Sequence, residues 1–143
     1  MAIVVWGRRK MKDLESTKRE LLDLTQRLLD AVSEADWDAY QRLCDPTLTC
    51  FEPETHGHLV EGMDFHGFYF DLGPAEKPHN TTICSPQVRI LGDTAVVCYV
   101  RLTQQMDPAV GKPVTRGFSE TRVWHRDEEG AWRQVHFHRS PCG

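Results

Sequence analysis

The sequence predicts one α+β domain in which helices pack on one face of an antiparallel sheet. Helical periodicity is confined to the first half of the chain, and strand-like segments joined by short turns fill the second half. The length of 143 residues favours a single domain that buries a core of its own. Elements segregated in this way, instead of alternating along the chain, are typical of the α+β class.

The first helix is predicted by a broad apolar stripe between Leu14 and Val32. Such a stripe indicates an amphipathic helix that is covered on more than one side. Residues 1–10 begin with an apolar run and end with Gly7-Arg8-Arg9-Lys10, and we expect a tail or a short strand there. The stripe consists of Leu14, Leu21, Leu22, Leu24, Leu28, Leu29 and Val32.

Two shorter helices and a strand are predicted between the first helix and the sheet. Asp36 is a suitable cap for a helix over 37–43, and this helix ends before Pro46, because proline disfavours helix at the residue that precedes it. A short strand over 47–51 and a third helix over 62–72 follow. The third helix is predicted by apolar residues at helical spacing, namely Phe65, Phe68, Tyr69 and Leu72.

Four longer strands complete the predicted fold, and short turns join them. Gly92-Asp93 and the segment 127–130 carry the residues that hairpin turns need. The predicted strands cover residues 81–91, 94–105, 115–126 and 131–139.

The strand that begins at Thr94 is apolar on both of its faces. Val97 and Tyr99 point to one face, because side chains alternate along a strand. A sheet that is covered on one side usually shows polar residues on the other. We therefore expect a second copy of the chain to cover the open face, and we predict a homo-oligomer. The apolar residues of that face are Val96, Cys98, Val100 and Leu102.

The net charge and the cysteine content narrow the possible partners of the protein and its location in the cell. The net charge of −4 does not favour binding to nucleic acid or to an anionic membrane surface. No apolar run approaches the ~20 residues that a membrane-spanning helix needs. The five cysteines contain no Cys-x-x-Cys pair, and we interpret them as reduced thiols of a cytoplasmic protein.

The tripeptide His125-Arg126-Asp127 imitates the start of the catalytic loop of protein kinases. That loop requires asparagine five residues after the aspartate, where this chain has Trp132. We therefore predict no kinase activity and no catalytic residues. One alternative stays open, in which the domain is a small-molecule enzyme or carrier and His66 moves protons inside a pocket.

Histidines at alternating positions are weak candidates for a zinc site. Imidazoles and nearby carboxylates are zinc ligands, but such pairs arise by chance in a chain with seven histidines. We predict no metal and no cofactor. The residues concerned are His56, His58, His136 and His138, with Glu52 and Glu54 as the carboxylates.

Three arginines, Arg101, Arg122 and Arg139, each lie two residues from an aromatic residue on the same strand face. Arginines on strands are often charges at the rim of a sheet. If all three point inward, they form a pocket that binds an anion through their planar, multiply donating guanidinium groups.

Several blocks of residues, in this order along the chain, carry a resemblance to a known family. The sequence closely resembles the C-terminal association domain, or hub, of calcium/calmodulin-dependent protein kinase II, from roughly Lys10 to Ser140. Its most specific blocks are Cys44-Asp45-Pro46, Phe51-Glu52-Pro53-Glu54, Leu59-Val60-Glu61-Gly62-Met63-Asp64-Phe65-His66, Val100-Arg101-Leu102-Thr103-Gln104, Ser119-Glu120-Thr121-Arg122-Val123-Trp124-His125-Arg126 and Val135-His136-Phe137-His138-Arg139-Ser140.

The resemblance implies a nuclear-transport-factor-2-like (NTF2-like) cone with a long N-terminal helix packed in a strongly curved antiparallel sheet. It implies an association domain over 11–140, between an N-terminal segment and a short tail over 141–143. It also implies dimers that assemble into two stacked rings, as dodecamers, tetradecamers or larger assemblies. A further alternative stays open, in which the chain is a free-standing hub that co-assembles with subunits that carry a kinase.

A deep pocket that accepts small carboxylates is the last implication of the resemblance. Its positive lining corresponds to Arg101, Arg122 and Arg139, with His66 at its mouth as an additional donor when the pH falls. With Glu120 offsetting one charge, we expect a net positive cavity. The segment 71–77, which is shorter than the family's loop, distinguishes this chain from the family pattern.

Overall fold

The structure is a computed structural model that describes the backbone of residues 2–143 and the side chains of residues 11 and 13–143. Within these residues the elements follow in the order α1 (Ala2–Glu34), α2 (Trp37–Leu43), β1 (Cys44–Phe51), the 3-10 turn η1 (Pro53–Thr55), β2 (Val60–Glu61), α3 (Asp64–Asp71), β3 (His79–Leu91), β4 (Thr94–Asp107), β5 (Lys112–Arg126) and β6 (Trp132–Pro141).

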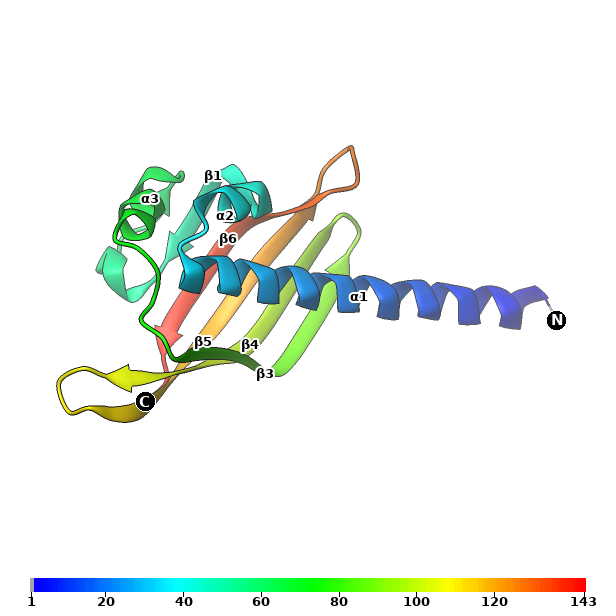
Figure 1. Cartoon of the computed structure of the whole chain (residues 1–143). Coiled ribbons are helices and arrows are strands. Elements are labelled where there is room, and N and C mark those ends of the chain that lie inside the picture. The colour runs from blue at the N-terminus through cyan, green and yellow to red at the C-terminus, as the bar shows by residue number, and fades with distance from the viewer. Residues whose placement is uncertain (1) are drawn as a thin grey trace.

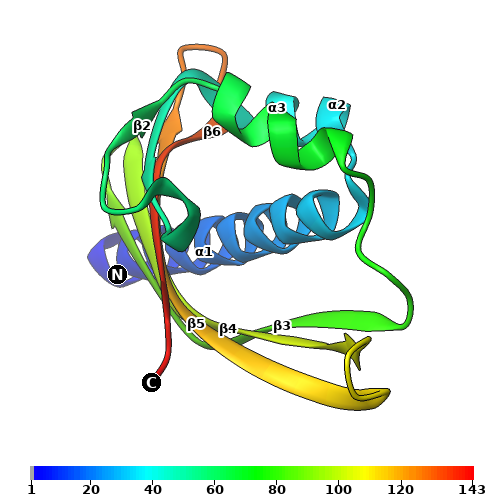
Figure 2. The same ribbon diagram turned by 90° about the vertical axis from the view of Figure 1, so that its left-hand side faces the viewer.

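The elements form an open cone around the long helix. Helix α1 lies across the concave face of a curved sheet, and α2 and α3 lie beside it (Figure 1). Viewed along the helix, the sheet bends around α1 while α2 and α3 close the opposite side (Figure 2). The predicted α+β class and the long helix in a strongly curved sheet are therefore confirmed.

The sheet differs from the prediction in one respect, because it is mixed and not wholly antiparallel. Its six strands are ordered β2-β1-β6-β5-β4-β3, and β1 runs parallel to β6, with Cys50 beside Phe137. The chain leaves β1, passes through α3 and the β3–β4–β5 meander, and returns beside β1 in the same direction. Alternation within a strand indicates its two faces but not which distant strand lies next to it, so the sequence did not reveal this pair.

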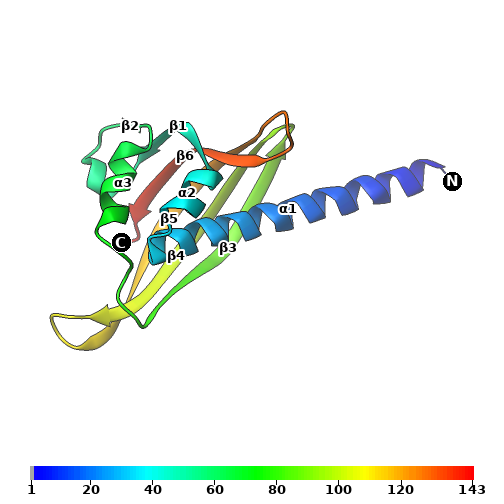
Figure 3. The same cartoon turned by 45° about the horizontal axis from the view of Figure 1, so that its top comes forward.

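Both ends of the chain differ from the expected tails. Residues 2–10 continue α1, whereas Met1 lies outside the described residues, and the N-terminal part of this helix projects beyond the sheet (Figure 3). No proline interrupts this stretch, so nothing in the sequence ends the helix before Leu14. At the other end, β6 reaches Pro141, and the Cys142 amide donates to the Gly117 carbonyl at 2.9 Å.

Helix α1 is 33 residues long. Neither α1 nor any other helix in the described part of the chain has a stretch apolar enough to cross a membrane.

The core is formed where α1 packs on the concave face of the sheet. Leu21, Leu28 and Leu29 are completely buried, as are Val97 and Trp124 from the strands beneath them. Each buried leucine contributes about 2 kcal/mol relative to an exposed one. The predicted stripe is therefore the packed face of α1, although Leu14 and Val32 at its two ends are exposed.

Helix α3 is turned so that its predicted apolar stripe faces outward. Phe68 and Leu72 are 63% and 70% exposed, whereas His66 is the buried residue of this helix. Phe70, one turn after His66, packs on Trp37 and Tyr40. The helix itself was predicted correctly, but an apolar period does not reveal the buried face when apolar residues occur on both sides.

The convex face of β4 is apolar and only partly covered. Val96, Cys98, Val100 and Leu102 are half-buried and lie on the side of the sheet away from α1. Their cross-strand neighbours on β3 and β5 supply the partial cover, for instance Val123 beside Val96. The two-sided apolar pattern predicted for this strand is therefore present in the fold.

Candidate functional site

The fold brings all four predicted site residues to one cavity of ≈ 220 Å³ between the sheet, α3 and the end of α1. Strands β4, β5 and β6 supply one arginine each, because Arg101, Arg122 and Arg139 all point to the concave face. Helix α3 supplies His66. The other lining residues are Val32, Tyr40, Glu52, Glu54, Tyr69, Phe70 and Phe137.

Arg122 is the buried centre of a hydrogen-bonded network. Its Nε donates to the Tyr99 hydroxyl at 2.7 Å, one Nη donates to Glu120 at 2.5 Å, and the other donates to the side-chain oxygen of Gln134. The guanidinium also lies over the Phe137 ring, 4.7 Å from its centroid. Burial alone lowers the pKa of Arg122, but Tyr99 and Glu120 outweigh this effect and raise it, so Arg122 stays charged and paired.

Arg139 is paired with carboxylates from the loop that follows β1. Its Nη2 donates to both carboxylate oxygens of Glu54, at 2.6 and 2.7 Å, and lies 3.5 Å from Glu52. The guanidinium stacks on the Phe118 ring at 4.7 Å. Burial raises the pKa of Glu52, although the charge of Arg139 opposes that effect.

Arg101 differs from the other two arginines because no hydrogen bond from its guanidinium to another side chain is found among the described residues. Its Nε is buried and finds no hydrogen-bond partner among the described residues, and the same holds for Glu120 Oε2, which lies 3.9 Å away. Burial lowers the pKa of Arg101, and Arg122 and Arg139 lower it further, against the opposing charge of Glu120. A small anion with oxygen acceptors would satisfy this guanidinium.

The charges of the cavity balance, which corrects the expected net positive lining. Arg101, Arg122 and Arg139 face three carboxylates, those of Glu52, Glu54 and Glu120. The sequence prediction counted only the carboxylate of Glu120. The loop that follows β1 contacts β6, and such a long-range contact was not visible in the sequence. The pattern Glu52-Pro53-Glu54 was noticed, but only as a weak source of zinc ligands.

His66 lies on the inner wall of the cavity and not at its mouth, because only 5% of it is exposed. Burial lowers its pKa to about 4, and the charge of Arg122 adds to this effect. The 3.9 Å contact between His66 Nδ1 and Glu52 is therefore not an ion pair at neutral pH. The predicted gain of a donor under mildly acidic conditions is wrong for this reason.

One group of three possible metal ligands occurs among the described residues, namely Cys50, Glu52 and His66, whose ligand atoms lie within 4.8 Å of one another. Burial, with Glu52 as the next cause, raises the pKa of Cys50 to about 12, so its thiol is protonated. The positive charge of Arg122 nearby opposes a second cation. The group is better described as a thiol–imidazole contact of 3.7 Å than as a metal site.

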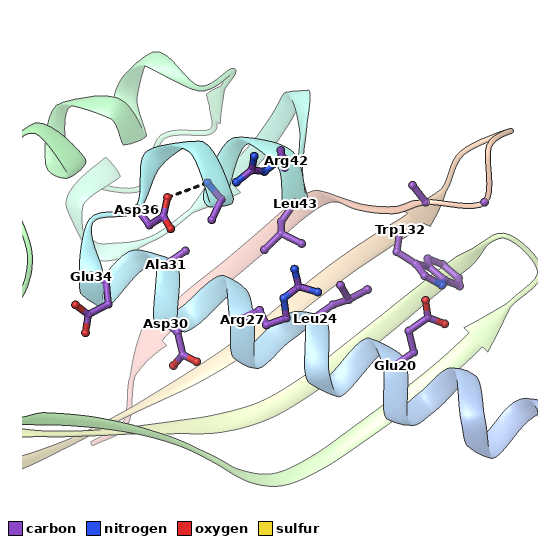
Figure 4. Close-up of a pocket in the computed structure, with 13 residues that line it drawn as sticks. Glu20, Leu24, Arg27, Asp30, Ala31, Glu34, Asp36, Arg42, Leu43 and Trp132 are labelled. Atoms are coloured by element: carbon purple, nitrogen blue, oxygen red, sulfur yellow. Dashed lines mark hydrogen bonds between the residues drawn. The ribbon is translucent and has the colours of Figure 1, made fainter.

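The largest cavity, of ≈ 530 Å³, lies elsewhere, between α1, α2 and the turn before β6. It contains none of the predicted site residues. Figure 4 shows its mixed walls, where Glu20 of α1 lies near Trp132, and Arg27 and Arg42 come from α1 and α2. We did not predict this cavity, because its charged residues are ordinary for the exposed side of a helix.

Comparisons with known proteins agree on one family. A family profile described as the calcium/calmodulin dependent protein kinase II association domain matches residues 17–143. The delta subunit of calcium/calmodulin-dependent protein kinase type II from Oryctolagus cuniculus is 49% identical over 132 residues, which cover 90% of this chain and 24% of that protein. The chain thus spans about a quarter of the length of this relative.

Solved structures extend the comparison to the fold. The association domain of C. elegans CaMKII superimposes with a TM-score of 0.82 at 47% identity, covering 88% of this chain and 96% of that one. An NTF2-like superfamily protein from Salmonella enterica superimposes with a TM-score of 0.74 at 19% identity, covering 91% and 94%. The second similarity shows that the fold is NTF2-like.

Proposed function

Because this chain belongs to the calcium/calmodulin-dependent protein kinase II association-domain family, we propose that it is an oligomerisation hub with a ligand cleft on its concave face. The observation that carries the proposal is the convex face of β4. Val96, Cys98, Val100 and Leu102 form an apolar surface that the chain itself covers only in part. Contiguous apolar surface of this kind marks protein–protein contacts.

The assembly is a two-ring multimer, a dodecamer, a tetradecamer or a larger form. Two convex faces placed against each other form a self-complementary dimer, whereas a closed ring needs a second, head-to-tail contact. Stable interfaces of this kind bury about 1,600 Å² or more. A small change in the angle of the head-to-tail contact changes the number of subunits, so several ring sizes are compatible with one fold.

Subunits that carry a kinase are the proposed partners of this hub. The relative from Oryctolagus cuniculus is a kinase subunit in which the matching segment is about a quarter of the length. If both chains use the same interfaces, they form mixed rings. Mixing the two proteins and isolating one through an affinity tag tests this: recovery of both chains supports co-assembly, and recovery of one chain alone contradicts it.

The ligand of the cleft is a small carboxylate, and Arg101 is its main contact. A buried guanidinium without a partner loses its hydration at a cost of several kcal/mol, and an anion restores the missing contacts. Arg122 orients the wall of the cavity, because each of its three guanidinium nitrogens already donates to a protein side chain. Arg139 is engaged by Glu54 and Glu52 through its Nη2 group, so its Nε and Nη1 are the donors left for a ligand.

Thermal denaturation tests this part of the proposal. At about 100 times its dissociation constant, a carboxylate that binds only the folded protein adds roughly 2.7 kcal/mol of stability. We expect acetate or butyrate to raise the melting temperature relative to chloride at equal ionic strength, and Arg101→Gln to abolish the shift. Equal shifts in the wild type and in Arg101→Gln would show that the arginine does not bind the anion.

The alternative function, a small-molecule enzyme or carrier, receives no support from the acid–base groups of the cavity. Near neutral pH the Cys50 thiol is protonated and His66 is neutral, since their pKa values are about 12 and about 4. A thiol nucleophile needs a lowered pKa, and a general base works best with a pKa near the working pH.

A further inference from the structure

A second cavity, of ≈ 260 Å³, adjoins the first and extends the cleft toward the tip of the β4–β5 hairpin. We call the first cavity the inner chamber and the second the outer chamber. The two share Val32, Arg101 and Arg139 as lining residues. The remaining lining of the outer chamber comprises Ser33, Ala75, His79, Asn80, Thr81, Thr103, Gln104, Gln105, Arg116 and Phe118.

The two chambers differ in charge. Glu52 and Glu54 line the inner chamber, whereas no acidic residue is among the residues that line the outer one. Arg101, Arg116 and Arg139 face the outer chamber, together with neutral threonine, asparagine and glutamine side chains that donate hydrogen bonds. Of the two, the outer chamber therefore provides the better environment for an additional negative charge.

The register of the sheet places Arg116 at a fixed separation from Arg101. Arg101 pairs with Phe118, and Thr103 pairs with Arg116, so the two arginines are diagonal neighbours on the concave face. Diagonal neighbours on paired strands are separated by roughly 7–8 Å. Phe118 is two residues from Arg116 on the same strand face and lines the outer chamber, with the Arg139 guanidinium stacked on its ring.

We propose that the outer chamber is a second anion subsite and that the preferred ligand of the cleft is a short dicarboxylate. One carboxylate binds Arg101, the second binds Arg116, and the methylene groups between them lie against Phe118. This inference rests on the proposed carboxylate-binding function and specifies its ligand class. Two arginines at diagonal positions on paired strands offer two planar guanidinium forks, and two carboxylates on a short chain engage both forks whereas one compact anion engages one.

The second contact is weaker than the first, because Arg116 is exposed and must be ordered when it binds. A charge-assisted hydrogen bond of this kind still favours the dicarboxylate. We expect succinate to bind on the order of fivefold to tenfold more tightly than butyrate, which has the same number of carbon atoms and one carboxylate.

Isothermal titration calorimetry of the assembled protein with succinate and with butyrate, at equal ionic strength, tests the inference. The variants are Arg116→Gln and Arg19→Gln; Arg19 is an exposed arginine of α1 whose substitution changes the net charge equally. We expect Arg116→Gln to reduce succinate affinity to the level of butyrate, and Arg19→Gln to preserve the wild-type preference. Native mass spectrometry verifies that each variant still assembles.

The possible outcomes separate the two proposals. Equal affinities of wild type for succinate and butyrate overturn the dicarboxylate inference and leave the carboxylate site intact. A preference for succinate that survives Arg116→Gln, or that falls equally in Arg19→Gln, also overturns the inference, because the second carboxylate would then not bind Arg116. Binding of neither ligand overturns the carboxylate site itself.

Discussion

The two faces of strand β4 differ in chemistry although alternating residues of one strand form both of them. On the concave face, Val97 and Tyr99 are buried beneath α1, and Arg101 follows them at the edge of the cleft. On the convex face, Val100 and Leu102 are apolar and half-buried, with no helix over them. One strand thus lines the proposed ligand site on one side and the proposed interaction surface on the other.

The comparison shows that the concave face is the side on which charged groups are buried, which costs desolvation free energy. Arg122 and Glu120 are 3% and 2% exposed, and each has a charged or polar partner. Buried charges of this kind are tolerated when they are paired and hydrogen-bonded, so removal of one partner is destabilising. On the convex face, β4 presents the apolar residues Val96, Val100 and Leu102 instead of buried charges.

The largest expected effect comes from breaking the buried network of the concave face. Glu120→Gln leaves the charge of Arg122 without its carboxylate, and loss of one partner of a buried ion pair costs about 3–5 kcal/mol. We expect this loss in the free energy of unfolding from urea denaturation at pH 7 and constant protein concentration. Glu128→Gln, on the exposed turn before β6, is the control. Equal stability of both variants would contradict the role of the network.

The second effect is a pH dependence of the free energy of unfolding, and it comes from His66. Its pKa is about 4 in the folded protein and near 6.5 in the unfolded chain, so the unfolded state takes up a proton first as the pH falls. Stability due to this residue is therefore present above pH 6.5 and is lost between pH 6.5 and 4, by about 3 kcal/mol.

The contribution of His66 is isolated by subtracting the pH profile of His66→Gln from that of the wild type. The subtraction is necessary because burial raises the pKa of Glu52. The stability contributed by Glu52 therefore changes with pH in the opposite direction to that contributed by His66. His58→Gln, which alters an exposed histidine in the loop before β2, controls for the loss of one imidazole. A flat difference profile between pH 4 and 7 would contradict the burial argument.

A smaller effect concerns the carboxylate that already occupies Arg139. Glu54 is partly exposed and competes with a ligand for that guanidinium. We expect Glu54→Gln to increase butyrate affinity about two- to fivefold, since exposed pairs of this kind are worth up to about 1 kcal/mol. Glu61→Gln on β2 is the matched control. Unchanged or weaker binding in Glu54→Gln would show that Glu54 does not compete.

Local patterns predicted most of the fold. The helix over 37–43 has the predicted bounds, and Asp36 accepts a hydrogen bond from the Ala39 amide as its cap. The arginines of the three central strands also point to the face that their parity predicted. These features depend on neighbours within a few residues, where periodicity and capping preferences apply directly.

Features that depend on distant contacts were not accessible from the sequence. The parallel pairing of β1 with β6 and the contact of Glu54 with Arg139 join segments about 85 residues apart. The low pKa of His66 is caused by burial, and α3 buries a different face from the one that its apolar spacing indicated. The spacing of apolar residues identifies a helix or a strand, but the face that is buried depends on the elements that pack against it.

Native mass spectrometry of the wild type and of Val100→Asp tests the central claim, that the convex face assembles the hub. We expect a two-ring multimer for the wild type and small species for Val100→Asp, because a carboxylate in the apolar interface is costly to desolvate. Val110→Asp, at an exposed loop position that is 63% accessible, places the same charge outside this face and should preserve the multimer. A wild type that is monomeric at micromolar concentration, or a Val100→Asp variant that assembles like the wild type, would contradict the account.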